Sequence, residues 1–411
     1  MRVLFTNHYS CHNRGCEAIV RTTGRTVADG IDCDAIALPS RSPAHDQAVL
    51  ADSGLPFAHS ERRPGLAERA LRRLQTRGVL GSDRRLWPLP VPRAWQHAIA
   101  QSDLVISVGG DNYTLDYGIP TATAGIDDCA ARHGRPVVLW GASVGPFTER
   151  PAYERALAVG LARFALITPR ERTTAAYLRD DLGLDAIQPM PDPAFALAPE
   201  PLEPSPLAES LHSHGAFIGV NLSPLLARRA GEGAFARAAG TLLRRLLARA
   251  DTRVLLIPHV EHPPATGKTG DYAFLRQLIA DLDLVPSAAE RLHLVSPDLR
   301  AGQYKHIVGY CRCLVSARTH LAIAGYAQGV PTVALGYSRK AGALDHDVYG
   351  DAGHHLPAER FSAATVERAV DSALEARDDL TARAARYLRD GEADAAAARR
   401  KLAAVAAGGA P

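Results

Sequence analysis

Short apolar runs recur along the chain and alternate with longer stretches of helical pattern. Continuous apolar runs occupy residues 3–6, 104–108, 137–140, 165–168, 217–221, 254–258, 314–316 and 332–335. Continuous runs are typical of parallel strands that are covered on both faces. Helical stretches separate them, among others at residues 153–164, 173–182, 233–249 and 272–281. This order predicts βαβ units and doubly wound parallel sheets, which is an α/β fold.

The strand runs stop near residue 195 and restart at residue 217, and a segment rich in Pro, Ser and Glu lies between them. This interruption predicts two Rossmann-like domains, at residues 1–196 and 215–370, joined by a linker. Residues 41–93 show little strand character, so we expect a long insertion there, with one helix near 65–77. The Ala- and Arg-rich tail, residues 371–411, is expected to be helical.

Composition excludes several classes of function. The chain has 411 residues, an apolar fraction of 46% and a formal net charge of +3, which indicates a globular protein without nucleic acid or an anionic membrane as its main partner. The six cysteines contain no Cys-x-x-Cys pair, which argues against a disulfide framework and favours a reducing compartment. The N-terminus lacks the apolar core of a signal peptide, and no apolar run approaches the roughly 20 residues of a transmembrane helix. We expect a soluble, cytoplasmic protein.

Candidate binding residues follow the first strands of the predicted N-terminal sheet. Ligands of open α/β sheets bind at the carboxyl ends of the strands. Asn13 and Gly15 lie in the loop between the first strand and a helix, where backbone N–H groups can hold an anion. Asn13 can equally close its own turn. The strand at 104–108 ends in Gly109, Gly110 and Asp111, where glycines let a ligand approach the backbone, although a simple turn explains them as well.

Cationic side chains follow three other strands. Arg170 comes directly after the strand at 165–168, and its planar guanidinium suits phosphate or carboxylate. Arg318 and His320 follow the strand at 314–316, and Lys340 follows the next strand. A histidine at a helix N-terminus faces the positive end of the helix dipole, which lowers its pKa and suits proton exchange near neutral pH. We therefore expect Arg170, Arg318 and Lys340 to bind one anion together.

Two further histidines, His259 and His262, flank Glu261 after the strand at 254–258. Their spacing matches no established set of metal ligands, and a third ligand is not evident. We therefore expect no metal site.

Taken in order, these segments resemble the polysaccharide pyruvyl transferase family. The sequences that carry the resemblance are NRGCEAI (13–19), DLVISVGGD (103–111), PRE (169–171), PDPAF (191–195), RTH (318–320) and the Tyr-x-x-Lys of Tyr337 and Lys340. The resemblance covers nearly all of the chain except residues 41–93. Cys16 stands where the first motif usually has Asp, so the role of that carboxylate is not transferred. Glu171 stands where the third motif has Asp, which is a milder change.

The resemblance implies a fold and an activity. It implies two Rossmann-like domains facing a cleft, similar to the GT-B glycosyltransferases. It implies that phosphoenolpyruvate donates a pyruvyl group to a sugar of a polysaccharide or glycoconjugate, an acceptor that can be lipid-linked, and that a ketal forms without any metal or other cofactor. His320 would be the catalytic acid or base. The substrate-binding residues would be Asn13, Arg170, Arg318, Lys340, Gly109, Gly110, Asp111 and Tyr337.

Two alternatives remain open from the residues. A GT-B glycosyltransferase would use the same fold, with Arg318 and Lys340 binding the diphosphate of a nucleotide-sugar. A non-catalytic sugar-binding relative would keep the fold and lose the reaction, and Cys16 leaves room for that reading.

Overall fold

The computed structural model describes residues 1–61, 66, 70, 91–214, 217–263, 266–336, 339–352 and 354–409. The chain passes four times between two units. Unit 1 comprises Met1–Cys11, Ile19–Pro193 and Gly391–Pro411, and unit 2 comprises His12–Ala18 and Ala194–Asp390. The short passage through unit 2 at the start of the chain carries the first motif up to Ala18.

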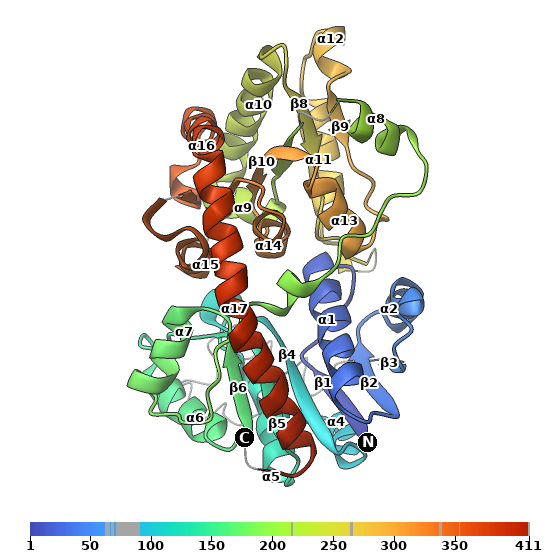
Figure 1. The fold of residues 1–411 in the computed structure, drawn as a ribbon, viewed down its shortest axis with the longest axis vertical. Coiled ribbons are helices and arrows are strands. Elements are labelled where there is room, and N and C mark those ends of the chain that lie inside the picture. Colours follow the sequence, from blue (N-terminus) through green and yellow to red (C-terminus); the bar gives the residue numbers. More distant parts are fainter. Residues whose placement is uncertain are drawn as a thin grey trace. The chain divides into compact units, whose positions relative to one another are not determined.

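Unit 1 contains a parallel sheet with the strand order β3-β2-β1-β4-β5-β6 and flanking helices (Figure 1). Its strands are β1 (Arg2–Thr6), β2 (Ala35–Ser40), β3 (Phe57–Glu61), β4 (Leu104–Tyr113), β5 (Val137–Val144) and β6 (Leu166–Pro169). The helices of this part of the chain are α1 (Arg14–Gly30), which begins in unit 2, α2 (Pro43–Leu50), α4 (Arg93–Ala100), α5 (Thr121–Arg132), α6 (Pro151–Leu161) and α7 (Arg172–Ala176). The strand order reverses between β1 and β4.

Unit 2 repeats this architecture with the order β12-β11-β10-β7-β8-β9. Its strands are β7 (Phe217–Asn221), β8 (Arg253–Leu256), β9 (Leu292–Leu294), β10 (Cys311–Ser316), β11 (Thr332–Gly336) and β12 (His355–Pro357). Its helices are α8 (Pro206–His214), α9 (Pro224–Ala230), α10 (Glu232–Ala248), α11 (Asp271–Ala280), α12 (Pro286–Ala289), α13 (Ala301–Val308), α14 (Thr319–Ala327), α15 (Arg339–Tyr349) and α16 (Ala363–Glu375). Numbered from β7, the sheet has the same order as unit 1. Both are the doubly wound order of dinucleotide-binding domains, which confirms the predicted pair of Rossmann-like domains.

All eight predicted strands are present, and they include the central strands of both sheets. Every residue of β5 is buried, as expected for a strand covered by helices on both faces. The strands that the apolar runs do not reveal lie toward the edges. β3, with the sequence FAHSE, is largely exposed, and β9 and β12 are half-buried. Edge strands need fewer apolar residues because one side faces solvent.

The interpretation of residues 41–93 as an insertion with little strand character is wrong for its first part. α2 and β3 lie there, and β3 pairs with β2 to complete the sheet of unit 1. The helix expected near 65–77 falls outside the described residues, apart from Leu66 and Ala70. The Pro-rich segment expected to be a linker contains α8, which belongs to unit 2.

The helical tail ends in α17 (Arg377–Ala406), which divides between the units at Asp390 and Gly391. Its first part packs in unit 2, where the Tyr387 ring lies 5.4 Å from that of Phe195. Its last turns contribute Ala398, Leu402 and Val405 to the apolar core of unit 1. Among the described residues, we find no helix with both the length and the apolar character that a bilayer crossing requires.

Candidate functional site

The carboxyl ends of three neighbouring strands of unit 2 bring polar side chains together. β10, β7 and β8 are adjacent in the sheet, and the strand order reverses between β10 and β7. Asn221 ends β7, His259 follows β8, and Arg318 follows β10. Ligands of open α/β sheets bind outside the carboxyl ends of the strands at such a reversal. This edge of the sheet is therefore the candidate site.

Asp271 joins the three strand ends. Its fully buried carboxylate accepts hydrogen bonds from Nη2 and Nε of Arg318, at 2.6 Å and 3.1 Å. It also accepts from the backbone N–H groups of His259 (3.2 Å) and Val260 (3.1 Å) and from the amide of Asn221 (3.3 Å). A bidentate pair of this kind fixes the plane of a guanidinium as well as its position. Arg318 is thus oriented by a residue that no sequence motif indicated.

His320 is the second residue of α14, and Arg318 is the N-cap residue of that helix. Gly15, near the start of α1, lies directly against the imidazole, since a Cβ atom on Gly15 would overlap Nδ1, Cγ and Cβ of His320. The φ angle of Gly15 lies outside the left-handed region, so space rather than backbone conformation requires a glycine there. The first motif therefore fixes where the ring of His320 can lie.

Backbone hydrogen bonds hold the first motif against the end of β8. Arg14 N donates to the His259 carbonyl at 3.1 Å, and Glu261 N donates to the His12 carbonyl at 2.9 Å. Asn13 forms a turn of its own, in which its side-chain oxygen accepts from Gly15 N at 2.9 Å. This turn is one of the two readings that the sequence left open for Asn13. A contact between Asn13 and a ligand stays a prediction.

His259 is a buried imidazole within this site. Burial lowers its pKa well below the ordinary value, and the charges of His320, Arg318 and Arg14 act in the same direction. The ring at 259 is consequently neutral at physiological pH. Glu261 shows the opposite effect, because burial and then the neighbouring charge of Asp271 raise its pKa, while a hydrogen bond from Tyr272 N opposes them.

The carboxyl ends of β1 and β4 form a second polar cluster, in unit 1. Buried Asp127 accepts hydrogen bonds from Thr6 Oγ1 (2.6 Å), Asn7 Nδ2 (2.7 Å) and the Tyr113 hydroxyl (2.6 Å). Burial still raises the pKa of Asp127 above its ordinary value. This network stabilises the ends of the two strands at the reversal of the sheet.

The strand β4 continues beyond the predicted 104–108 and contains Gly109 and Gly110, which have structural explanations. A Cβ atom at Gly109 would overlap the carbonyl oxygens of Trp140 and Gly141 on β5, and Gly110 has a φ of +90°. Both observations account for glycine without a ligand. The predicted contacts of Gly109, Gly110 and Asp111 with a substrate stay predictions.

Arg170 is enclosed by acidic groups of unit 1. Its guanidinium donates from Nη2 to Asp111 Oδ1 (2.6 Å), from Nη1 to Asp192 Oδ2 (2.5 Å) and from Nε to Glu171 Oε1 (2.9 Å). The side chain is 1% exposed. An anion would have to displace at least one of these carboxylates to reach Arg170, so the contacts favour a role in holding Asp111. Direct anion binding by Arg170 stays a prediction.

Two predicted residues cannot be placed. Tyr337 lies outside the described residues, and so does the side chain of Lys340, although its backbone belongs to α15. The convergence of Arg170, Arg318 and Lys340 on one anion therefore stays a prediction. Within the described residues, a group of three potential metal ligands occurs in unit 1.

A family model described as polysaccharide pyruvyl transferase matches residues 44–339. No curated protein matches the sequence. A protein described as a UDP-N-acetylglucosamine 2-epimerase of Listeria monocytogenes is similar in structure, with a TM-score of 0.60 at 15% identity over 93% of this chain and 90% of its own. The UDP-GlcNAc 2-epimerase of Neisseria meningitidis, solved with UDP-GlcNAc, is similar with a TM-score of 0.58 at 12% identity over 93% of both chains.

HepE of Anabaena, solved with UDP and glucose, is also similar, with a TM-score of 0.55 at 12% identity over 96% of this chain and 98% of its own. At such low identities these likenesses concern the fold alone. They support the two-domain, Rossmann-like fold class of the GT-B enzymes.

Proposed function

Because the chain belongs to the polysaccharide pyruvyl transferase family, we propose that it moves a pyruvyl group from phosphoenolpyruvate to a sugar and forms a ketal. The observation that carries the proposal is the arrangement of Arg318 and His320 after β10. Asp271 orients the guanidinium of Arg318, and Gly15 leaves room for the ring of His320. An anion-binding group and a proton donor thus stand two residues apart at the strand ends where α/β proteins bind ligands.

The reaction needs a proton at one carbon and two oxygen nucleophiles at its neighbour. A proton is added to the methylene carbon of phosphoenolpyruvate, which becomes a methyl group and leaves C2 electrophilic. Two hydroxyls of the acceptor sugar bond to C2 and lose their protons, and the C2–O bond to phosphate breaks. The products are the cyclic ketal and inorganic phosphate. A positioned acid typically contributes a factor of about 10²–10⁴ to such a step.

In this proposal each residue of the site has a defined task. His320 donates the proton to the methylene carbon and recovers one from an attacking hydroxyl. Arg318 binds the phosphate or carboxylate of the donor, because charge-assisted hydrogen bonds from a guanidinium suit both groups. Asp271 is a positioning residue that acts through Arg318. Because the ring of His259 is neutral, it adds no positive charge beside His320.

A second candidate is transfer of a sugar from a nucleotide-sugar donor. The observation that favours it is the set of similar folds solved with UDP, UDP-GlcNAc or UDP and glucose. In that case Arg318 would bind a diphosphate at the same strand ends, and His320 would need no carbon acid or base chemistry.

Calorimetric titration separates the two candidates. Our proposal predicts that phosphoenolpyruvate binds and that UDP-sugars do not. A mass-spectrometric screen of sugar acceptors with phosphoenolpyruvate should then show products heavier by one pyruvic acid less one water. Binding of UDP-sugars without any binding of phosphoenolpyruvate would refute the proposal, and binding of sugars alone would indicate a non-catalytic relative.

A further inference from the structure

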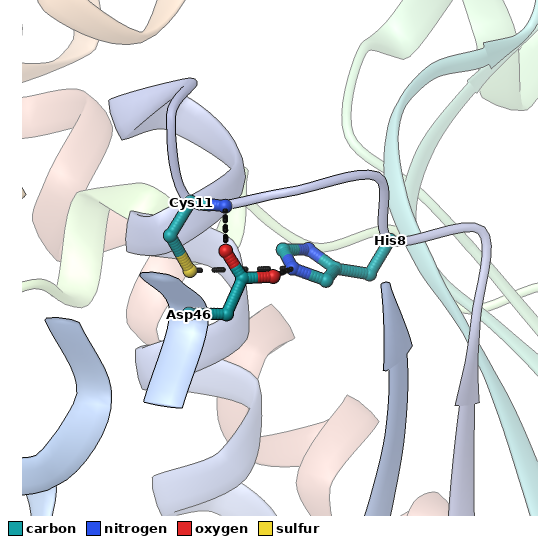
Figure 2. Close-up of side chains that lie close together, drawn as sticks. All are labelled: His8, Cys11 and Asp46. Carbon is teal, nitrogen blue, oxygen red and sulfur yellow. Dashed lines mark hydrogen bonds and ion pairs between the residues drawn. The ribbon is translucent and has the colours of Figure 1, made fainter. Parts of the chain in front are cut away.

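Three side chains of unit 1 converge outside the site described above. His8 and Cys11 lie in the loop after β1, and Asp46 lies in α2. All three residues are at most 2% exposed, and their potential ligand atoms lie within 4.8 Å of one another. Figure 2 shows the imidazole and the thiol turned toward the same carboxylate.

The geometry differs from that of a nucleophile activated by a histidine. Nε2 of His8 lies 2.9 Å from Oδ2 of Asp46, and the same nitrogen lies 4.0 Å from Sγ of Cys11. In a catalytic triad the nucleophile and the acid face different ring nitrogens. Here a nitrogen, a sulfur and an oxygen surround one point, which is the arrangement of ligands around a cation.

The carboxylate of Asp46 is held as a ligand would be. Its Oδ1 accepts hydrogen bonds from Ser10 Oγ (2.9 Å) and Cys11 N (2.8 Å), while Oδ2 faces His8. Ligating carboxylates are commonly oriented by such outer hydrogen bonds.

We infer that His8 Nε2, Cys11 Sγ and Asp46 Oδ2 form a binding site for a divalent cation of the zinc type. Zinc binds imidazole, thiolate and carboxylate in a tetrahedron, with bond lengths of about 2.0–2.3 Å. These lengths place N and O about 3.3 Å apart and S and N about 3.6 Å apart. The observed separations of 2.9 Å and 4.0 Å each need a change of about 0.4 Å to reach those values.

A cation bound here would join the loop after β1 to α2 and so stabilise the stretch of chain that leads into the first motif. Its role would be structural, because none of these ligands belongs to the candidate site of unit 2.

Cobalt(II) titration of the full chain, first stripped with a chelator, tests the inference. Wild-type protein should bind one equivalent and show thiolate-to-cobalt absorption together with the intense visible bands of tetrahedral cobalt. Cys11→Ser should lose the thiolate absorption, and Asp46→Asn should weaken binding at least tenfold. Cys33→Ser is the matched control, because the Cys33 thiol lies in the same unit and bonds to the Ala35 carbonyl, so both signals should persist.

Zinc-edge X-ray absorption of the wild-type protein decides the question even if Cys11→Ser does not fold. We expect one sulfur neighbour at about 2.3 Å and otherwise nitrogen or oxygen. The inference would be overturned by a wild-type protein that takes up no stoichiometric cobalt or zinc, by a zinc spectrum without sulfur, or by thiolate absorption that survives Cys11→Ser.

Discussion

Replacing Gly15 by alanine adds one methyl group where the first motif meets His320. That methyl would overlap Nδ1, Cγ and Cβ of His320, so the ring has to move away. Packing strain of about 1–3 kcal/mol opposes the substitution, whereas the better helix propensity of alanine favours it by up to about 1 kcal/mol. We therefore expect a stability loss of at most about 3 kcal/mol, a shift of a few degrees in Tm for a chain of this size.

The effect on catalysis should be much larger than the effect on stability. A displacement of about 1 Å of a catalytic group can cost about 10²-fold in rate. Gly15→Ala should thus lower kcat for pyruvyl transfer about 10²-fold, measured at saturating phosphoenolpyruvate with an acceptor from the screen. Donor affinity, measured by calorimetry, should change little because Arg318 and Asp271 are untouched.

Gly30→Ala is the matched control for this experiment. Gly30 ends the same helix, and a Cβ atom there meets nothing within 4 Å, so rate and Tm should stay near those of the wild type. A folded Gly15→Ala enzyme with the wild-type kcat would refute the argument that Gly15 fixes the ring of His320.

Three further predictions concern charges in the structure. Arg318→Lys keeps the positive charge but loses the bidentate hydrogen bonds to Asp271, so phosphoenolpyruvate should bind about 1.5–3 kcal/mol more weakly by calorimetry. An unchanged Kd would exclude an anion-binding role for Arg318. Arg170→Met leaves three carboxylates without their cation and should lower the free energy of unfolding in urea by about 3–5 kcal/mol, whereas a loss below about 1 kcal/mol would show that the ion pairs stabilise little. Burial raises the pKa of Asp345 from 3.8 to about 6. Between pH 3.8 and about 6 the folded state therefore keeps a proton on Asp345 that the unfolded state has lost. Stability should therefore fall by up to about 3 kcal/mol as pH rises through that window, and Asp345→Asn should flatten this part of the urea-unfolding profile; an identical slope in the variant would contradict it.

The fold could be predicted from the sequence wherever a strand is buried along its length. Strands such as β5 and β7 are buried along their whole length and stand out as continuous apolar runs. β3 is an edge strand with an exposed FAHSE sequence, and nothing in that composition distinguishes it from a loop. Its position became evident only through its pairing with β2.

The candidate site was predictable where it depends on local order along the chain. Arg318 and His320 follow a strand and open a helix, as the RTH segment indicated. The partners of these residues were not predictable, because Asp271 and Gly15 lie 47 and 305 residues away from Arg318 and His320. The same holds for Arg170, whose neighbouring acids include Asp111 and Asp192.

This difference has a physical reason. Positive charges at strand ends can be counted in a sequence, whereas the carboxylates that neutralise them come from distant segments. The cluster of His8, Cys11 and Asp46 was missed in the same way, since 35 residues separate Cys11 from Asp46. A sequence therefore predicts which residues are near a strand end better than it predicts which of them face a ligand.

The central claim is that His320 donates a proton to the methylene carbon of phosphoenolpyruvate. The most direct test is pyruvyl transfer by His320→Asn at saturating donor, with a melting curve of the same preparation and His293→Asn, on the edge strand β9, as the control. We predict a loss of at least about 10²-fold in kcat for His320→Asn with an almost unchanged Tm, and no loss for His293→Asn. A stable His320→Asn protein with near-normal turnover would contradict the account.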